Sequence, residues 1–269
     1  MKKMTKIVSL LLALVMGACT LLSCGSTDWA YIEEKGSLTM GITLFEPMNY
    51  YDDAGKLIGF ETEFAEEVCA RLGVTAEFQV IDWEPKEAEL KSRAIDLIWN
   101  GLTVTEERRE NMAFSTAYVR NEQVIVIKKA NAEKYATIEG MAGASVIAEN
   151  GSAGQTAYET NEILSKNSFT PAAGQKDALL EILAGTSEIA IVDLVMAQAS
   201  IKEGTDYENL MIVDGISLTA EEYAVGVRLE DTELLSKLNA AIDSMVQDGT
   251  LKALADKYGL ADVYAFNET

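Results

Sequence analysis

The apolar residues of this chain recur with two different periods, and the two periods alternate along most of its length. Apolar and polar side chains alternate through residues 37–42, which is the pattern of a half-buried strand. In residues 60–72 the apolar side chains recur at helical spacing, and Gly73 follows as a stop signal. The alternation of strand and helix continues to Gly259, which predicts an α/β protein with a mostly parallel sheet.

Later segments repeat both patterns. Two amphipathic helices close the chain, one stopped at Gly249 and the other at Gly259. No internal repeat and no low-complexity tract appears in the sequence. Short apolar or β-branched runs predict further strands at residues 77–81, 95–99, 124–127, 144–148, 189–192 and 223–227.

The connection after residues 95–99 combines a turn with the start of a helix. Asn100 and Gly101 form a turn dipeptide. Thr105 is a residue type favoured at helix N-caps, and the acidic residues after it suit the first helical turn. A strand therefore ends at a polar loop and a helix begins beyond it. In α/β sheets, ligands bind in the crevice at the carboxyl ends of strands.

Three residues of this connection carry groups that a ligand could use. Gly101 lets a ligand approach the backbone closely. The Thr103 hydroxyl can donate and accept hydrogen bonds, and the Arg108 guanidinium matches a carboxylate. The alternative is an ordinary strand–loop–helix connection with a solvated arginine, because a motif remains a hypothesis until its structural context is known.

The N-terminal segment has the composition of a signal peptide. Lysines at positions 2, 3 and 6 precede an apolar run at residues 7–22, which gives a charged n-region and an apolar h-region. The run is short for a membrane span, which disfavours the alternative of a transmembrane anchor. We therefore predict a signal peptide at residues 1–23 and a protein that works outside the cytoplasm.

The composition excludes several classes of chemistry. The 269 residues are 48% hydrophobic, enough for one large or two modest domains. The formal charge of −21 repels nucleic acid phosphates, so we expect no nucleic acid partner. The chain has no histidine, which removes histidine triads, general bases and metal ligands. It also has no CxxC pair, and we expect no metal and no cofactor.

Two further strand ends carry polar groups. Residues 144–148 lead into the small-residue loop 150–155, whose free N–H groups could hold an anion, although a plain turn is the commoner meaning of such a loop. The strand at residues 189–192 ends in Asp193. Arg108 with helix-end N–H groups would hold a carboxylate, and Asp193 would hold an ammonium. Together they fit the zwitterion of a free α-amino acid, since buried ionic groups need such partners.

Three apolar residues have two possible roles. Phe45 and Trp83 lie in loops after predicted strands, where they could flank a ligand side chain. A single aromatic residue is nevertheless more often part of the core. Cys69 sits in the apolar stripe of a predicted helix, so we expect it in the core rather than in a disulfide or a reactive site.

The end of the N-terminal apolar run resembles the lipobox of bacterial lipoproteins. Leu21 stands three residues before Cys24, and a small residue directly precedes that cysteine. The resemblance implies cleavage before Cys24, a fatty acyl group such as palmitate on it, and attachment to the membrane through a tether at residues 24–29. Cys19 is a rival cleavage site, but Met16 matches the lipobox less well than Leu21.

A pattern of seven segments extends beyond these single motifs: DAGKLIGFE at 53–61, IDW at 81–83, IDLI at 95–98, GLTVTEER at 101–108, FS at 114–115, GSAG at 151–154 and DGTL at 248–251. Their order and spacing within residues 36–259 make the pattern specific. It resembles the polar amino-acid-binding proteins of bacterial ABC importers, the family that includes glutamine- and histidine-binding receptors.

The resemblance implies a two-lobed periplasmic-binding-protein-like fold of type II. Two α/β lobes would be joined by two crossing hinge strands and would close on the ligand. The crossings would lie near residues 122–124 and 221–223. The N-lobe would comprise residues 30–122 plus 223–269, and the C-lobe residues 123–222.

Carried over motif by motif, the resemblance also implies the ligand contacts. Arg108 would bind the α-carboxylate, helped by the backbone N–H groups of Thr103 and Ala153. The Gly101 carbonyl, the Thr103 hydroxyl and the Asp193 carboxylate would bind the α-ammonium. The full set of predicted ligand-binding residues is Phe45, Glu61, Trp83, Gly101, Thr103, Arg108, Ala153, Gly154 and Asp193.

Two positions depart from the family pattern. Glu61 stands where the family usually has an aspartate, which sometimes reaches the ligand. The loop around Phe45 is shorter than in basic-amino-acid receptors, and their acidic residue there has no clear counterpart, which argues against a basic specificity. The sequence does not tell which amino acid binds.

The implied function is that of a non-catalytic, monomeric substrate-binding lipoprotein. It would capture a free, polar L-α-amino acid between its two lobes and deliver it to the permease subunits of an ABC importer. Two alternatives belong to other classes. The first is a dehydratase of the same fold, which would need an acid such as Glu61 in the cleft. The second is a sensory domain, which would normally be fused to a transmembrane signalling module, and we expect none because the sequence up to Thr269 contains no such module.

Overall fold

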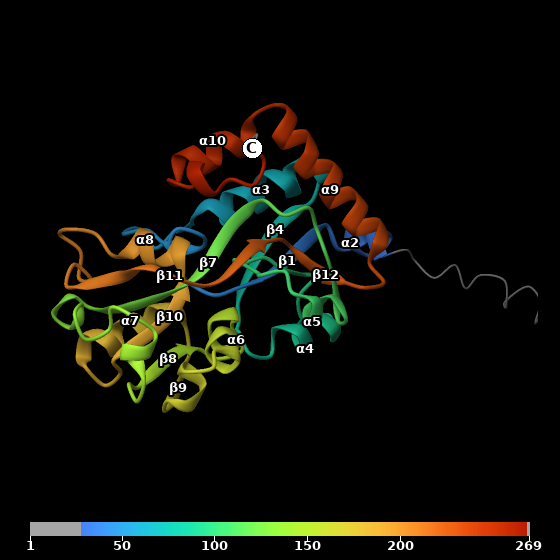
Figure 1. The fold of residues 1–269 in the computed structure, drawn as a ribbon. Coiled ribbons are helices and arrows are strands. Elements are labelled where there is room, and N and C mark those ends of the chain that lie inside the picture. Colours follow the sequence, from blue (N-terminus) through green and yellow to red (C-terminus); the bar gives the residue numbers. More distant parts are fainter. Residues whose placement is uncertain (1–27, 268–269) are drawn as a thin grey trace, which may run out of the picture.

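The computed structural model describes residues 28–267, which form two α/β lobes connected by two long strands (Figure 1). This confirms the predicted fold class. The first lobe begins with elements that alternate between strand and helix. They are α2 (Asp28–Lys35), β1 (Ser37–Ile42), β2 (Tyr50–Tyr51), β3 (Leu57–Ile58), α3 (Phe60–Leu72), β4 (Thr75–Val80), α4 (Lys86–Lys91), β5 (Leu97–Ile98), α5 (Glu106–Arg109) and β6 (Met112–Phe114).

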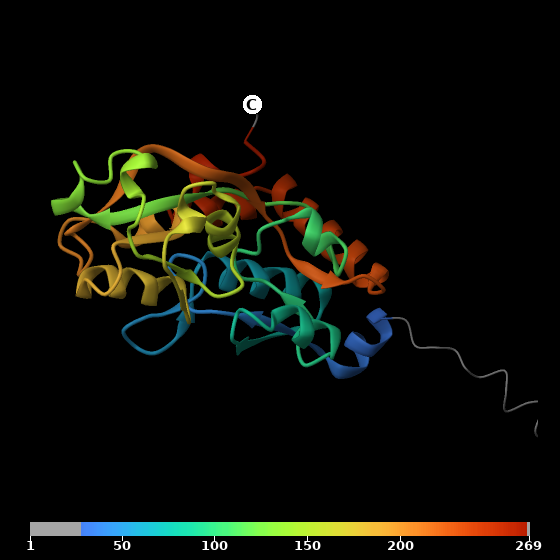
Figure 2. The same cartoon turned by 60° about the horizontal axis from the view of Figure 1, so that its bottom comes forward.

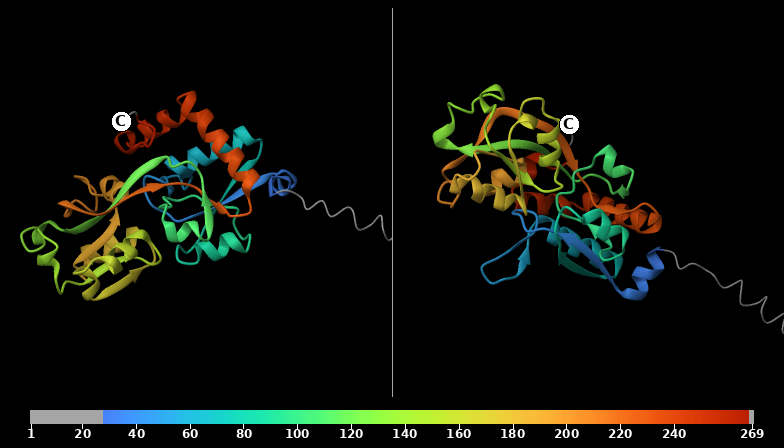
Figure 3. Two further views of the ribbon diagram at one scale, coloured as in Figure 1. Left: turned by 45° about the vertical axis from the view of Figure 1, so that its right-hand side comes forward. Right: turned by 90° about the horizontal axis from the view of Figure 1, so that it is seen from below.

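The two connecting strands are β7 (Val119–Lys128) and β11 (Leu210–Tyr223), which run side by side between the lobes (Figures 1 and 3). They pair antiparallel, with Val119 opposite Tyr223 and Lys128 opposite Leu210. The chain between these two strands forms the second lobe. Its elements are η1 (Lys129–Asn131), η2 (Glu139–Met141), β8 (Val146–Glu149), α6 (Ala153–Thr160), η3 (Leu164–Lys166), β9 (Phe169–Ala172), α7 (Gln175–Ala184), β10 (Ile189–Asp193) and α8 (Leu194–Ser200).

The chain returns to the first lobe after β11. Helix α9 packs against α2 and α3, so the C-terminal helices lie beside the N-terminal elements (Figures 1 and 2). The first lobe is therefore built from two separate parts of the sequence. Its later elements are β12 (Gly226–Arg228), α9 (Thr232–Gln247), α10 (Thr250–Lys257) and η4 (Ala261–Val263).

Each lobe has a five-stranded sheet, and both sheets are mixed. The strand orders are β4-β1-β5-β12-β6 in the first lobe and β11-β7-β10-β8-β9 in the second. Strand β1 runs parallel to β4 and β5, and β8 runs parallel to β9 and β10. Strands β12 and β7 pair antiparallel with their neighbours. The prediction of a mostly parallel sheet thus fails next to the connecting strands, which lack the helical crossover that parallel neighbours need.

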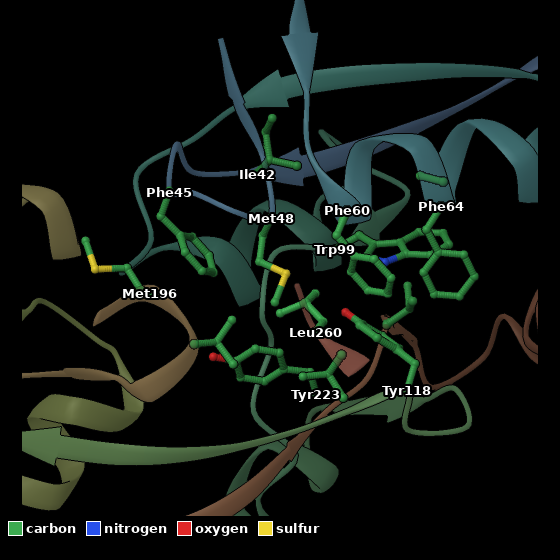
Figure 4. Close-up of a cluster of buried hydrophobic side chains, with 14 of the residues drawn as sticks. Ile42, Phe45, Met48, Phe60, Phe64, Trp99, Tyr118, Met196, Tyr223 and Leu260 are labelled. Carbon is green, nitrogen blue, oxygen red and sulfur yellow. The ribbon is translucent and has the colours of Figure 1, made fainter. Parts of the chain in front are cut away.

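A cluster of aromatic side chains fixes the start of β7 on the first lobe (Figure 4). Phe64 of α3 meets Trp99 and Tyr118 edge-on, with ring centroids 4.9 and 5.3 Å apart. Phe60 adds a tilted contact with Tyr118 at 6.1 Å. Such pairs contribute about 0.5–1.5 kcal/mol each beyond the burial of their area. The residue before β7 is therefore held firmly against α3.

The folded part begins earlier than the sequence suggests. We predict a tether at residues 24–29, but α2 starts at Asp28 and buries Trp29. The Asp28 carboxylate accepts a hydrogen bond from the Leu234 N–H at 2.9 Å, which ties this end to α9. The predicted signal peptide and Cys24 lie outside the described residues. Within residues 28–267, no helix is both long and apolar enough to span a bilayer.

Candidate functional site

A narrow cavity, partly open to solvent, lies between the two lobes. The ends of strands from both sheets surround it, as expected for a ligand site in an α/β protein. The first lobe contributes Phe45, Trp83, Asn100, Gly101, Thr103 and Arg108. The second lobe contributes Glu149, Ser152, Ala153, Gln175 and Asp193.

Arg108 is a buried cation that forms no ion pair within the described part of the chain. The Thr105 hydroxyl caps α5 by accepting a hydrogen bond from the Arg108 backbone N–H at 3.1 Å, as the sequence predicts. The guanidinium donates to the Thr103 carbonyl at 2.8 Å and to the Gly151 carbonyl of the second lobe at 3.4 Å. No carboxylate within residues 28–267 forms an ion pair with it, and burial lowers its pKa. Such a group can still pair with an anion in the cavity.

Asp193 is the corresponding buried anion, at the end of β10. One carboxylate oxygen accepts hydrogen bonds from the side-chain amides of Asn121, at 2.9 Å, and Gln123. The other oxygen accepts from the amide of Gln175. Burial raises the pKa of Asp193. Three neutral amides hold the carboxylate in place without neutralising it, so a cation from a ligand would complete the site.

Two of these amides also reach the other connecting strand. The Asn121 and Gln123 side chains donate to the Glu221 carboxylate at 2.6 and 2.7 Å. Burial, and then the nearby Asp193 charge, raise the pKa of Glu221 to about 7. Asp193 is thus tied to both β7 and β11. The sequence does not indicate Asn121, Gln123 and Glu221 as site residues, because each resembles an ordinary polar residue of a strand.

Gly101 and the two predicted aromatic residues shape the first-lobe wall. Gly101 has a φ of +54°, and a Cβ atom there would lie 2.7 Å from the Phe45 ring and 3.3 Å from Tyr223. Only glycine therefore lets the Phe45 ring close over this loop. Phe45 and Trp83 both line the cavity, and the Lys86 ammonium lies 4.8 Å from the centre of the Trp83 ring.

Two of the predicted ligand-binding residues do not line the cavity. Glu61 is buried beneath Gly101, whose N–H donates to both carboxylate oxygens at 2.9 Å, and the Tyr118 hydroxyl also donates to it. Burial raises the pKa of Glu61 to about 7. A Cβ atom at Gly154 would lie 2.9 Å from the Ile191 carbonyl, so this glycine allows α6 to pack closely on β10. Both residues support the wall from behind.

The loop before α6 contributes to the opposite wall. The Ser152 side chain caps α6 by accepting a hydrogen bond from the Gln155 N–H at 3.2 Å. Ala153, the first residue of this helix, lines the cavity. The small-residue loop therefore leads into a helix whose first residue lies at the cavity, as the sequence predicts.

Three further lining residues were missed. Asn100, in the predicted turn, accepts a hydrogen bond from the Thr43 hydroxyl at 2.6 Å and donates to the Asn49 side chain at 2.7 Å. Glu149 is the last residue of β8 and directly precedes the loop that we singled out, so the strand-end rule could have found it. Gln175 begins α7 and offers no local signal.

The fold and the cavity between its lobes define a two-lobed solute-binding protein. Residues 38–261 match the model of the bacterial extracellular solute-binding proteins, family 3, and the chain belongs to this family. The family resemblance seen in the sequence is thereby confirmed.

Individual proteins that resemble this chain are also amino-acid-binding or substrate-binding proteins. The chain is 31% identical over 237 residues to the L-cystine-binding protein TcyJ of Escherichia coli (strain K12), covering 86% of each chain. A solved ABC uptake transporter substrate binding protein from Streptococcus pneumoniae with bound histidine gives a TM-score of 0.82 at 33% identity, covering 90% of this chain and 99% of that one. The ancestral amino acid-binding protein AncCDT-1, a precursor of cyclohexadienyl dehydratase, gives 0.77 at 26% identity, covering 85% and 97%.

Proposed function

We propose that this protein is the extracytoplasmic substrate-binding lipoprotein of an ABC importer. It captures a free L-α-amino acid between its lobes and delivers it to the permease. The observation that carries the proposal is a pair of opposite, buried charges in one cavity. Within the described residues, the Arg108 guanidinium donates only to carbonyl groups, and the Asp193 carboxylate accepts hydrogen bonds from neutral side chains and forms no ion pair. A zwitterion supplies both missing counter-charges. The cystine- and histidine-binding proteins similar to this chain support the same ligand class.

The two charged ends of the ligand have separate sets of partners in this proposal. The Arg108 guanidinium and the N–H groups of Thr103 and Ala153 bind the α-carboxylate. The Asp193 carboxylate, the Gly101 carbonyl and the Thr103 hydroxyl bind the α-ammonium. This arrangement is supported by the position of all five residues on the cavity wall.

The side chain of the ligand lies against the aromatic residues Phe45 and Trp83. Glu61 and Gly154 act without touching the ligand, because Glu61 holds the Gly101 N–H and Gly154 sets the packing of α6. This changes the role that we predict for Glu61 and Gly154 from the family resemblance, in which both contact the ligand.

The lobes close by bending at the connecting strands. We place the N-lobe at residues 30–122 plus 223–269, preceded by the start of α2, and the C-lobe at residues 123–222. These boundaries fall next to Asn121 and Glu221, which are joined by a hydrogen bond across the pair of strands. The protein works as a monomer, held at the membrane by a fatty acyl group on Cys24.

Binding without catalysis is the proposed activity. Glu61, the acid that we considered for a dehydratase of this fold, does not line the cavity. An amino acid incubated with excess protein should be recovered unchanged, and conversion of prephenate by the purified protein would contradict the proposal. Metabolic labelling with a fatty acid tests the anchor separately, because the label should be absent from Cys24→Ala while amino acid binding persists.

A thermal-shift screen of the purified protein against the free amino acids tests the binding function. A ligand that binds only the folded state raises the melting temperature by mass action. We expect a shift with at least one L-α-amino acid, and a much smaller shift with the same ligand in Arg108→Ala. If no amino acid shifts the wild-type protein, the proposed function is wrong.

A further inference from the structure

One acidic side chain on the cavity wall is not used by the two ends of a zwitterion. Glu149 is the last residue of β8 and lines the cavity from the second lobe. It is only 3% exposed, and its Oε1 atom has no hydrogen-bond partner within residues 28–267. No ion pair in this part of the chain includes it. A buried carboxylate of this kind costs free energy unless a partner is supplied.

The cations nearest to Glu149 are already engaged elsewhere. The Lys86 ammonium donates to the Trp83 carbonyl at 3.2 Å and to the Gly151 carbonyl at 3.0 Å. The Arg108 guanidinium donates to backbone carbonyls and, in the proposed function, pairs with the α-carboxylate of the ligand. Neither cation lies within ion-pair distance of Glu149. Within residues 28–267, this carboxylate therefore has no direct ion-pair partner.

The other charged groups around Glu149 make its anionic form less favourable. Asp193 of β10 and Asp177 of α7 both face it, while β9 carries no ionisable residue. Burial, and then the Asp193 charge, raise the pKa of Glu149 to about 8, although Lys86 and Arg108 act in the opposite direction. A neutral ligand would leave this acid protonated near neutral pH, whereas a cationic side chain would stabilise the carboxylate.

We propose that Glu149 determines the specificity of this site and selects α-amino acids whose side chain carries a second positive charge. The inference rests on the proposed function, which places the α-ammonium at Asp193 and leaves Glu149 to the side chain. The second charge could be a guanidinium or ammonium at the end of the side chain, or the second ammonium of a bis-amino acid such as cystine. The acidic residue that is missing from the Phe45 loop is thus replaced by one on the opposite lobe.

Calorimetric titration with matched ligands tests this selection. L-Arginine and L-citrulline have nearly the same shape, but citrulline replaces the guanidinium with a neutral urea group. L-Cystine provides the second source of charge, and L-glutamine serves as a neutral polar ligand. We expect arginine or cystine to bind at least about 30-fold more tightly than citrulline and glutamine, which is the scale of a buried charge pair.

Variants then assign the selection to one side chain. Glu149→Gln should weaken binding of the preferred cationic ligand at least about 30-fold and change citrulline affinity by less than about 3-fold. Glu162→Gln, at an exposed carboxylate of the same lobe, should change neither affinity. Melting temperatures of the ligand-free proteins check that Glu149→Gln folds, which we expect because this substitution keeps the size of the side chain.

The pH dependence gives a readout that a purely structural role would not produce. Binding a cation requires ionised Glu149, so the wild-type affinity should increase as the pH rises from about 6 to about 8.5, and this increase should be lost in Glu149→Gln.

Three results would overturn the inference. The first is equal or tighter binding of citrulline or glutamine, and the second is an unchanged preference in Glu149→Gln. In both cases amino acid binding that still depends on Arg108 would leave the proposed function intact. The third result, no binding of any amino acid by the wild-type protein, would overturn the proposed function and this inference together.

Discussion

The two charged ends of the cavity are held in place by different means. Arg108 is oriented by two backbone carbonyls, one from each lobe. Asp193 is oriented by three side-chain amides, and two of them, from Asn121 and Gln123, also bind Glu221 on β11. Any residue supplies a backbone carbonyl, so the groups that orient Arg108 do not depend on side-chain identity. The amides that orient Asp193 require asparagine or glutamine at particular positions. Changes at Arg108 remove only one long bond between the lobes, to the Gly151 carbonyl at 3.4 Å, so we expect them to act mainly on ligand affinity. We expect changes at Asp193 to act also on the two connecting strands.

The largest effect on binding is expected for Arg108→Ala. Removing the guanidinium leaves the ligand carboxylate with N–H donors only, in a desolvated site. Truncating one partner of a buried charge pair costs about 2–5 kcal/mol, which corresponds to roughly 30-fold to several-thousand-fold in affinity. Calorimetry measures this loss directly. The melting temperature of the ligand-free protein should change little.

Arg109→Ala provides the matched control for Arg108→Ala. The Arg109 side chain is half-exposed, lies 5.4 Å from the centre of the Phe114 ring and does not line the cavity. Its replacement should leave the affinity almost unchanged. Loss of binding in Arg109→Ala together with normal binding in Arg108→Ala would show that the neighbouring arginine holds the ligand.

Asp193→Ala should weaken binding on the same scale, about 2–5 kcal/mol, because the α-ammonium loses its counter-charge. Unlike Arg108→Ala, it should also lower the melting temperature of the ligand-free protein, since the buried amides of Asn121, Gln123 and Gln175 lose an acceptor. Thermal unfolding of the two variants side by side separates these effects. An equal melting temperature for both would remove the proposed difference between the two ends.

Local signals in the sequence predict parts of this site well. The N-cap at Thr105, the strand end at Asp193 and the helix opening at residues 152–154 are set by neighbouring residues, and the structure has all three. Their meeting in one cavity follows from the alternation of strands and helices, because strand ends gather at one edge of a sheet.

Contacts between distant segments could not be predicted in the same way. Gln175 and Asn121 reach Asp193 from 18 and 72 positions away, and nothing near either residue indicates this. The family resemblance implies a connecting strand only near residues 221–223, and the earlier part of β11 was missed. Register shifts between Ile212 and Thr219 interrupt its pairing with β7, and much of it is only partly buried, so it lacks a clear apolar pattern. The direction of the Glu61 side chain likewise depends on packing.

A smaller effect on binding is expected for Gly101→Ala, which changes the first-lobe wall of the cavity. The φ of +54° is unfavourable for alanine, and its Cβ atom would lie 2.7 Å from the Phe45 ring. The left-handed conformation alone costs about 1–2 kcal/mol for a residue with a side chain. We expect a lower melting temperature and roughly tenfold weaker binding by calorimetry. Unchanged affinity would show that the Phe45 ring does not need its position over this loop.

The smallest predicted effect is on the pH dependence of stability. Burial raises the pKa of Glu61 from its ordinary value of about 4.5 to about 7, so the folded state binds more protons than the unfolded chain between these pH values. The free energy of unfolding should therefore fall as the pH rises from about 4.5 to about 7. Glu61→Gln should make this decrease less steep, as measured by urea unfolding at several pH values. An equally steep decrease in the variant would contradict the assignment to Glu61.

The central claim is that Arg108 binds the α-carboxylate of the ligand. The most direct test changes the arginine of the protein and the carboxylate of the ligand, separately and together. Calorimetry would compare the amino acid that gives the largest thermal shift with its α-carboxamide, in the wild-type protein and in Arg108→Ala. The wild-type protein should bind the carboxamide at least about 30-fold more weakly. Arg108→Ala should bind both ligands with affinities within about 3-fold of each other. If Arg108→Ala still prefers the carboxylate as strongly as the wild-type protein does, another group holds the carboxylate and the account is wrong.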